Sequence, residues 1–383
     1  MSSWLSQITS TVTNIAGLTE EGSVKTPGDS AKDGQYYSEL TSKDYEWTLA
    51  SGSATENQIF YMTTKTGGFI FVQLIYSGIG LWKPTVSFTC RFYDPLSKKN
   101  KFKNFNQASE FTLSKDRRSV KTEFFNVTLD EASSKFKISI THPELIADLD
   151  YIRIDKGFKV GEGKTFLGGK DQNSAAGIVS HKFWPRCSAK GTIIIEKQYY
   201  EVDAYGMFIH AIQGMQPQLI ASKWNFIDFQ AKDAALSMMQ FTTTKQYGGV
   251  EVNQGSIVLH DKLISVCVEN NVEMLDLKKD PETDYDIPQS VKLSWKGKTI
   301  KENDTDQVKN VSVVMIVPLK NLIDKIDILA EIPWFLKKIV QTFVVKPYVY
   351  QWLDEATAEI TVGDEKFTCP GKCYQELVFV SAF

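Results

Sequence analysis

The first eighteen residues space their apolar side chains with the period of an α-helix. On a helical wheel the large apolar side chains share one face, and they are Trp4, Leu5, Ile8, Val12, Ile15 and Leu18. The opposite face carries Ser, Thr, Asn and Gly and no charged residue. A surface helix without basic residues binds a membrane by inserting bulky side chains into packing defects of the lipid. The pattern predicts a weak, reversible membrane-binding helix over residues 1–18, with a terminal helix docked on a folded domain as the alternative.

The next segment, residues 19–43, begins with a stretch rich in Gly, Ser, Pro and charged side chains. This composition is typical of a flexible linker. A linker at this place favours a helix that is tethered to the body of the protein over a helix that is docked on it.

From about residue 45 the pattern changes to short runs of Val, Ile, Thr, Phe and Tyr, separated by Gly, Pro, Asn and Asp. Many short strands at regular spacing predict antiparallel barrels or sandwiches rather than alternating strands and helices. A division near residue 200 gives two β-domains of similar size, 44–200 and 201–383. A short similarity between Gly68–Gly78 and Gly206–Gly214 suggests a duplication.

One short helix is predicted in the second β-domain. Pro333 can occupy a first helical turn, and the apolar and basic residues up to Phe343 make the segment amphipathic before Lys346-Pro347 ends it. We expect this helix to plug the mouth of a barrel, with a second membrane-contacting surface as the alternative.

The charges nearly balance, with 43 Lys and Arg against 46 Asp and Glu and a net charge of −3. A protein that neutralises many phosphates needs a basic excess, so we expect no nucleic-acid partner. Five scattered cysteines are too few for a disulfide framework and indicate a reducing compartment. The sequence has neither a secretory signal pattern nor an apolar run of membrane-spanning length, and it predicts a cytoplasmic protein.

The sequence offers little for catalysis or metal binding. Its four histidines show no H-x-x-x-H or H-E-x-x-H spacing. Cys369 and Cys373 form a C-x₃-C without a partner pair, which indicates a turn that carries two thiols. Neither a phosphate-binding loop nor a G-x-S-x-G elbow occurs. We therefore expect no metal, no cofactor and no catalytic residue.

Two stretches stand apart because they concentrate aromatic, methionine and amide side chains. One surrounds Phe183-Trp-Pro-Arg186, and the other extends from Ala204 to Phe226. A junction lined in this way is a candidate apolar pocket with a few polar anchors. The residues that we expect to line such an interdomain pocket and contact its ligand are His181, Trp184, Arg186, Tyr205, His210 and Trp224.

These stretches, with the uncharged amphipathic start, resemble the fungal survival-factor family of ceramide-binding proteins. The residues that carry the resemblance are Phe183-Trp-Pro-Arg186, Tyr205-Gly-Met-Phe208, Gln213-Gly-Met215 and Asp327-Ile-Leu-Ala-Glu-Ile-Pro333. The resemblance implies a mainly β protein with two tandem lipocalin-like antiparallel barrels behind an N-terminal amphipathic helix. This chain departs from the family at Glu196–Asp203. It has a short link there, where members of the family can carry a long acidic insertion.

The implied function is the transport of ceramide, or of a similar two-tailed lipid, between the endoplasmic reticulum and the Golgi. Such transport supports sphingolipid homeostasis and survival under oxidative stress. The resemblance implies a cytoplasmic protein that attaches reversibly to cis-Golgi and endoplasmic reticulum membranes, and a nuclear pool remains open. We expect the protein to act as a monomer.

Two other readings remain open. The first is an enzyme of the isomerase, cyclase or hydratase type that acts on an isoprenoid-like lipid, with acid–base candidates at His181, His210, Asp228 and Glu201. These four show no recognisable pairing in the sequence. The second is a scaffold that binds proteins only.

Overall fold

The computed structural model describes residues 22–31, 34–48, 54–78, 85–97, 99–107, 111–132, 134–215, 217–303, 305–328 and 347–380. The predicted N-terminal helix and the predicted helix from Pro333 to Phe343 lie outside the described residues. Among the helices within those ranges, none combines the length and the hydropathy that a membrane crossing requires.

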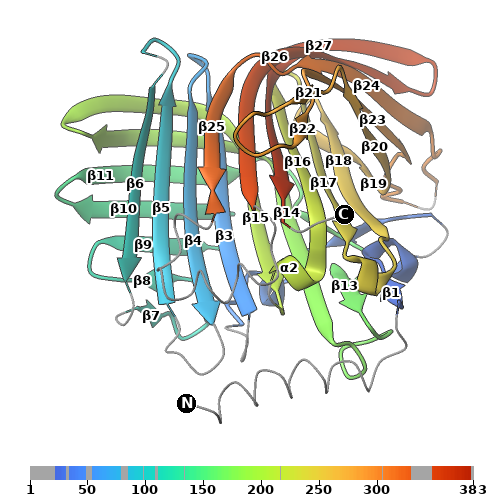
Figure 1. Cartoon of the computed structure of the whole chain (residues 1–383), viewed down its shortest axis with the longest axis horizontal. Coiled ribbons are helices and arrows are strands. Elements are labelled where there is room, and N and C mark those ends of the chain that lie inside the picture. The colour runs from blue at the N-terminus through green and yellow to red at the C-terminus, as the bar shows by residue number, and fades with distance from the viewer. Residues whose placement is uncertain are drawn as a thin grey trace.

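The described chain consists mainly of antiparallel strands in two large sheets that lie side by side (Figure 1). The first sheet and its short 3₁₀-helices are built from β1 (Val24–Lys25), η1 (Pro27–Ser30), β2 (Tyr37–Glu39), η2 (Ser42–Tyr45), β3 (Ala54–Thr64), β4 (Phe69–Gly78), β5 (Thr85–Asp94), β6 (Lys99–Gln107), β7 (Thr112–Leu113), β8 (Val120–Lys121), β9 (Phe125–Asp130), β10 (Lys135–His142), β11 (Leu145–Arg153), β12 (Phe158–Val160), β13 (Lys164–Leu167), β14 (Gly177–Ile195) and β15 (Gln198–Gln213).

The second sheet follows after a short helix. Its elements are α2 (Pro217–Ile220), β16 (Ala221–Ala231), β17 (Ala234–Thr243), η3 (Lys245–Tyr247), β18 (Glu251–Leu259), β19 (Lys262–Cys267), β20 (Glu269–Leu275), β23 (Ser290–Lys298), β24 (Asn310–Pro318), β25 (Leu322–Asp327), β26 (Tyr348–Val362) and β27 (Glu365–Phe379). A separate hairpin is formed by β21 (Lys278–Lys279) and β22 (Asp286–Ile287).

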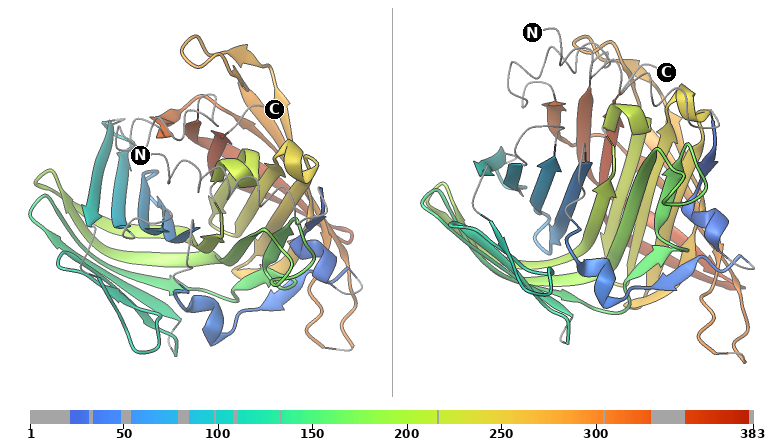
Figure 2. Two further views of the ribbon diagram at one scale, coloured as in Figure 1. Left: turned by 60° about the horizontal axis from the view of Figure 1, so that its bottom comes forward. Right: turned by 90° about the horizontal axis from the view of Figure 1, so that it is seen from below.

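The two sheets repeat one topology. Each begins with a four-strand meander, which is β3–β6 in the first sheet and β16–β19 in the second. In each, the last strand returns to pair with the first, β15 with β3 and β27 with β16. This return joins the meander to the remaining strands, and each sheet curves round into a nearly closed barrel (Figure 2). The predicted mainly β fold with two tandem lipocalin-like antiparallel barrels is therefore confirmed.

The details of the repeat differ from the sequence prediction. The similarity between Gly68–Gly78 and Gly206–Gly214 joins β4 to β15, which lie in the same sheet and at different places in it. By topology β4 corresponds to β17, and β15 corresponds to β27. The short similarity therefore reflects two apolar strands with a common pattern rather than the duplication itself.

The change from one sheet to the other falls between β15 and β16, whereas the sequence places the division between residues 200 and 201. That division lies inside β15, which pairs along its length with β14. Part of the expected linker 19–43 also belongs to the first sheet, because β1 pairs with β13 and β2 pairs with β12.

Alternation along the strands separates two kinds of core. In β3, Phe60 faces the lumen of the first barrel, whereas Tyr61 faces the second barrel. In β16, Phe229 faces the lumen of the second barrel and Phe226 faces the first. The rings of Tyr61 and Phe226 meet at 4.8 Å across the junction. Figure 2 shows the two curved sheets from two further directions. Apolar side chains thus line both lumens and also join the barrels to each other.

Candidate functional site

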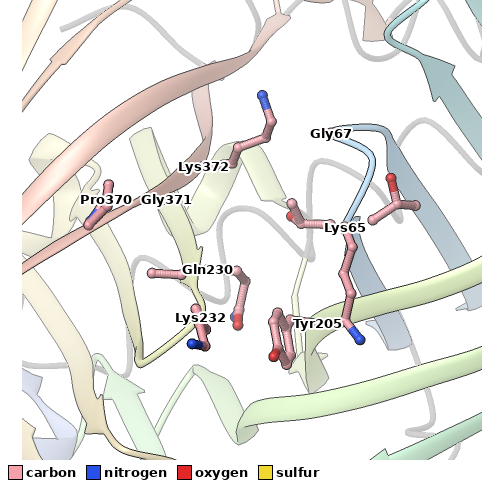
Figure 3. Close-up of a pocket in the computed structure, with 11 residues that line it drawn as sticks. Lys65, Gly67, Tyr205, Gln230, Lys232, Pro370, Gly371 and Lys372 are labelled. Atoms are coloured by element: carbon pink, nitrogen blue, oxygen red, sulfur yellow. The ribbon is translucent and has the colours of Figure 1, made fainter.

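A cleft with a volume of about 470 Å³ opens at the junction of the barrels. Its walls come from the β3–β4 turn, from β15, from the β16–β17 turn and from β27 (Figure 3). The lining residues are Thr63, Thr64, Lys65, Gly67, Tyr205, Gln230, Ala231, Lys232, Pro370, Gly371 and Lys372. Two of the lysines are already engaged, since Lys65 pairs with Asp203 and Lys372 pairs with Glu355.

Arg186 locks the junction beside this cleft. The pairing of β14 with β15 shifts register between Trp184 and Cys187, and this bulge contains Pro185, which has no N–H to offer the ladder. Arg186 is 1% exposed, and its guanidinium donates to Gln230 and to the main-chain oxygens of Ala231 and Lys232 at 2.8–2.9 Å.

Two further contacts complete the surroundings of Arg186. Its Nε donates to Asp261 Oδ1 at 3.0 Å, and the guanidinium lies 3.6 Å from the centre of the Tyr205 ring. Because its donors are used within the protein, Arg186 holds the barrels together rather than presenting a free charge to a ligand.

Asp228 lies in the same junction and is fully buried. Its Oδ1 accepts a hydrogen bond from Gln230 at 2.7 Å, and its Oδ2 has no partner among the described residues. Burial raises the pKa of Asp228 to about 7, against the opposing effects of the Gln230 hydrogen bond and the Arg186 charge. The carboxyl therefore titrates near neutral pH.

A row of polar side chains crosses the lumen face of the first barrel. In the registers of β14, β15 and β3, Lys182 is opposite His210 and His210 is opposite Gln58. Directly paired residues of antiparallel strands share one face. The row continues with the apolar residues Leu74 and Phe88 on β4 and β5. Polar groups thus occupy one side of a lumen that is otherwise apolar.

His210 forms a buried acid–base pair with Glu56 from the neighbouring row. His210 Nε2 lies 2.9 Å from Glu56 Oε1, and His210 Nδ1 lies 2.9 Å from the main-chain oxygen of Asp44. A carbonyl oxygen can only accept, so Nδ1 carries the hydrogen of the bond to Asp44. The N–H and the hydroxyl of Thr48 donate to the same carboxyl at 2.8 and 3.0 Å.

Gln58 is the exception in this network. It is completely buried, and neither its Nε2 nor its Oε1 has a hydrogen-bond partner within the described part of the chain. The indole Nε1 of Trp47 likewise has no partner there, and the Trp47 ring lies 5.8 Å from that of His210. A buried donor or acceptor without a partner costs about 1–3 kcal/mol. The lumen therefore presents unpaired donors and an unpaired acceptor at one place.

An aromatic layer adjoins the polar row. Trp184, Phe208 and Phe60 are opposite one another on β14, β15 and β3, and Phe136 packs against all three with ring centres 4.8–5.1 Å apart. Such a layer offers a wide apolar surface to hydrocarbon chains.

Lys182 adds a cationic group at the end of the polar row. Burial lowers the pKa of Lys182 to about 8, although the carboxylates of Asp44 and Glu56 oppose the change. Lys159, rather than Lys182, forms the ion pair with Asp44, at 2.8 Å. The amine of Lys182 thus gives up its proton more readily than a surface lysine does.

The structure distributes the predicted contact residues over four places. Trp184 and His210 face the lumen of the first barrel, whereas Arg186 and Tyr205 lie at the cleft. His181 faces the second barrel, where its Nδ1 lies 3.0 Å from Gln254 Nε2, and burial lowers its pKa to about 3.

Trp224 packs against Phe241 in an apolar cluster that includes residues of both sheets. The predicted membrane-contacting residues Trp4, Leu5, Ile8, Val12, Ile15 and Leu18 lie outside the described residues.

Sequence reasoning missed Trp47, Glu56 and Gln58. A signal for the last two is present, since Glu56-Asn57-Gln58 places polar residues on both faces of a strand that continues as Ile-Phe-Tyr-Met. Within the described ranges, no group of three or more His, Cys, Asp and Glu side chains is arranged to hold a metal ion.

Comparison with known proteins gives relatives that match nearly the whole chain. The model of the Svf1 family matches residues 2–381. The ceramide-binding protein svf-1 of Neurospora crassa is 32% identical over 378 residues, which cover 96% of this chain and 97% of the relative. The ceramide-binding protein svf1 of Schizosaccharomyces pombe is 32% identical over 345 residues, covering 89% and 90%.

Solved structures share the fold at low sequence identity. The structure of CghA with Sch210972 superposes with a TM-score of 0.61 at 12% identity and covers 86% of this chain and 89% of CghA. Kievitone hydratase from Nectria haematococca gives a TM-score of 0.53 at 12% identity, covering 95% and 98%. These likenesses establish the architecture and leave the chemistry to the residues of the site.

Proposed function

Because this chain belongs to the Svf1 family, we propose that it is a ceramide carrier that binds the lipid inside its first barrel. Several of its relatives are named ceramide-binding proteins. The carrier extracts ceramide from one membrane, shields it from water and releases it at another.

The observation that carries the proposal is the unpaired amide of Gln58. Ceramide has a neutral head with an amide and hydroxyl groups, so it both donates and accepts hydrogen bonds. Gln58 offers one donor and one acceptor of the same kind at a fully buried position. The indole N–H of Trp47 supplies a further donor. Binding ceramide pairs groups that have no hydrogen-bond partner among the described residues, and the aromatic layer around Trp184 contacts the hydrocarbon chains.

The same proposal includes reversible membrane attachment. The helix predicted over residues 1–18 docks on cis-Golgi and endoplasmic reticulum membranes and leaves again, because a helix without charge attraction binds weakly. Carriage between these membranes supports sphingolipid homeostasis and survival under oxidative stress. In this role the protein transports its ligand without changing it, so it is not an enzyme.

The test compares two variants of β3 that differ in which face they alter. Gln58→Leu removes the unpaired amide from the lumen. Thr63→Val removes a hydroxyl that is also buried and has no partner among the described residues, on the face toward the second barrel. We expect Gln58→Leu to weaken ceramide extraction from liposomes about tenfold, since two hydrogen bonds contribute roughly 0.5–1.5 kcal/mol each.

Both variants should keep or increase thermal stability, because each removes unpaired buried polar atoms. Wild-type ceramide binding by Gln58→Leu would contradict the assignment of the lumen. An equal loss of binding in Thr63→Val would contradict it as well, because that side chain faces away from the lumen.

A second candidate function rests on the hydrogen bond between His210 and Glu56. An acid–base pair inside an apolar lumen can protonate a hydrophobic isoprenoid-like lipid, as an isomerase, cyclase or hydratase requires. Incubation with the isoprenoid alcohol farnesol, followed by mass spectrometry, tests this reading. A product that His210→Gln abolishes would favour the enzyme, whereas recovery of unchanged farnesol and unchanged ceramide would favour the carrier.

A further inference from the structure

The second barrel also carries a row of polar residues on the strands that correspond to those of the first row, although most of the polar positions differ between the two rows. Across β26, β27, β16, β17 and β18 the residues that are opposite one another are Tyr350, Leu377, Asn225, Gln240 and Asn253. Asn225 lies four positions after the first residue of β16, and Gln58 lies four positions after the first residue of β3. The two amides thus occupy equivalent places in the repeated topology.

The row faces the lumen of the second barrel. Ile227 and Phe229, which alternate with Asn225 along β16, belong to the core of that lumen. The side chain of Asn225 donates to Gln240 Oε1 at 2.8 Å, so the two amides are joined across β16 and β17. Both residues are buried.

Four buried atoms in this lumen have no hydrogen-bond partner among the residues that the structure describes. Two of them are Asn225 Oδ1 and Gln240 Nε2, and the other two are Nε2 and Oε1 of Gln375. Gln375 is fully buried on β27, where it is opposite Ile227 on one side and Trp352 on the other. The residues opposite this amide on both adjacent strands are therefore apolar. The residue opposite Gln58 on β4 is apolar as well.

The chemistry of these atoms limits what they can bind. All four belong to uncharged amides, with two acceptors and two donors. An isolated charge would lose its hydration without a compensating counter-ion, whereas a neutral head that both donates and accepts hydrogen bonds fits all four atoms. The surrounding core, which includes Trp352, Met238 and Trp295, suits hydrocarbon.

We propose that the second barrel is a second lipid site, which takes a neutral amphiphile whose head has both a hydrogen-bond donor and an acceptor. This inference rests on the proposed function in one respect, because it extends lipid binding in a lumen from the first barrel to the second. A carrier with two such sites moves up to two lipid molecules in each cycle.

The test counts the lipid molecules that each chain retains. Full-length wild type, Gln58→Leu, Gln375→Leu and the double variant are incubated with phosphatidylcholine vesicles that contain ceramide or diacylglycerol, and each is then measured by native mass spectrometry. The two vesicle compositions show whether a site needs a lipid head with an amide, as in ceramide, or also takes a head with only hydroxyl and ester groups, as in diacylglycerol.

In at least one vesicle type, Gln375→Leu should lose one lipid molecule per chain, whether or not Gln58 is also changed. Retention of as many lipids as wild type in both vesicle types would overturn the second site. If wild type keeps one ceramide that only Gln58→Leu loses, and Gln375→Leu also keeps as many diacylglycerol molecules as wild type, the second site fails while the proposed function stands. If wild type keeps no ceramide, the proposed function itself fails.

Thr63→Val is the control for both barrels, because its side chain lies outside both lumens. Gln375→Leu should unfold at a temperature no lower than wild type. If Gln375→Leu folds poorly, Gln375→Met replaces it, because methionine keeps the length and flexibility of glutamine. The same result is expected of Gln375→Met, and the same result would overturn the proposal.

Discussion

At the scale of single residues, the surroundings of a side chain decide its chemistry. Asp228 is one of the four acid–base candidates from the sequence, and only the fold shows that it is buried between the barrels beside Arg186. Glu56, the actual partner of His210, was not among them, because the two residues are 154 positions apart in the chain. Pairing of this kind depends on strand register, which the sequence does not specify.

Asp228 makes stability depend on pH. Its pKa in the folded protein is about 7, against an ordinary value of 3.8, so between these values the folded state binds the proton more tightly than the unfolded state. The contribution of Asp228 to stability is therefore present below about pH 4 and is lost as the pH rises to about 7. Asp228→Asn should stabilise the protein at pH 8 and change little at low pH.

Thermal unfolding of wild type and Asp228→Asn from pH 4 to pH 8 measures this difference. The gap between the two melting temperatures should widen with pH and become constant above pH 7. A gap that does not change with pH would show that Asp228 is ionised throughout.

At the scale of elements, an interruption of β14 joins the barrels. The sequence marks Phe183-Trp-Pro-Arg186 as unusual in composition. In the structure the strand continues through a bulge, and the bulge directs Arg186 into the second barrel. The composition of the motif was therefore informative, whereas its place in the middle of a long strand was not predictable from local pattern.

Arg186→Lys should destabilise the protein by about 3 kcal/mol, because a lysine cannot reach Gln230 and both main-chain oxygens together. Urea unfolding followed by tryptophan fluorescence measures the loss. Lys65→Gln is the matched control, since the ion pair between Lys65 and Asp203 at the same cleft is half exposed and contributes about 0–1 kcal/mol. Equal effects of the two variants would contradict the role of Arg186 at the junction.

Gly206 tests the pairing of β15 with β3 in the wall of the first barrel. A Cβ at this position would lie 2.0 Å from the main-chain oxygen of Tyr61 on β3 and 2.8 Å from the hydroxyl of Tyr151. Gly206→Ala therefore forces β15 away from β3. We expect a lower melting temperature and loss of ceramide binding together, as measured by calorimetry and liposome extraction. Wild-type stability would show that the two strands approach less closely.

At the scale of the whole molecule, the protein is a repeat of one barrel. The strand-rich pattern of the sequence predicted a mainly β fold of antiparallel strands correctly. The sequence could not locate the transition between the sheets, because β15 belongs to the first barrel by its hydrogen bonds to β3 and β14, and local pattern does not record long-range pairing. For the same reason the predicted contact residues were expected in one interdomain pocket, although alternation along β14 and β15 sends them to different faces.

The proposed attachment of the whole molecule to membranes depends on the amphipathic N-terminal segment. Trp4→Asp combined with Ile8→Asp should release the protein from Golgi and endoplasmic reticulum membranes, because each buried apolar side chain contributes roughly 1.5–3 kcal/mol. Ser6→Asp combined with Ser10→Asp adds the same charge to the polar face and should leave localisation unchanged. Fluorescence microscopy of tagged variants measures both. Retention of the apolar-face variant on membranes would contradict the proposed attachment.

The central claim is that ceramide is held inside the first barrel, and photo-crosslinking tests it most directly. The purified protein is loaded with a photoreactive ceramide and irradiated, and the labelled peptides are mapped by mass spectrometry. The account predicts crosslinks at lumen-facing residues of β3, β14 and β15, among them Gln58, Trp184 and Phe208. Labels confined to the cleft around Tyr205 and Lys372, or absent from the first barrel, would contradict it.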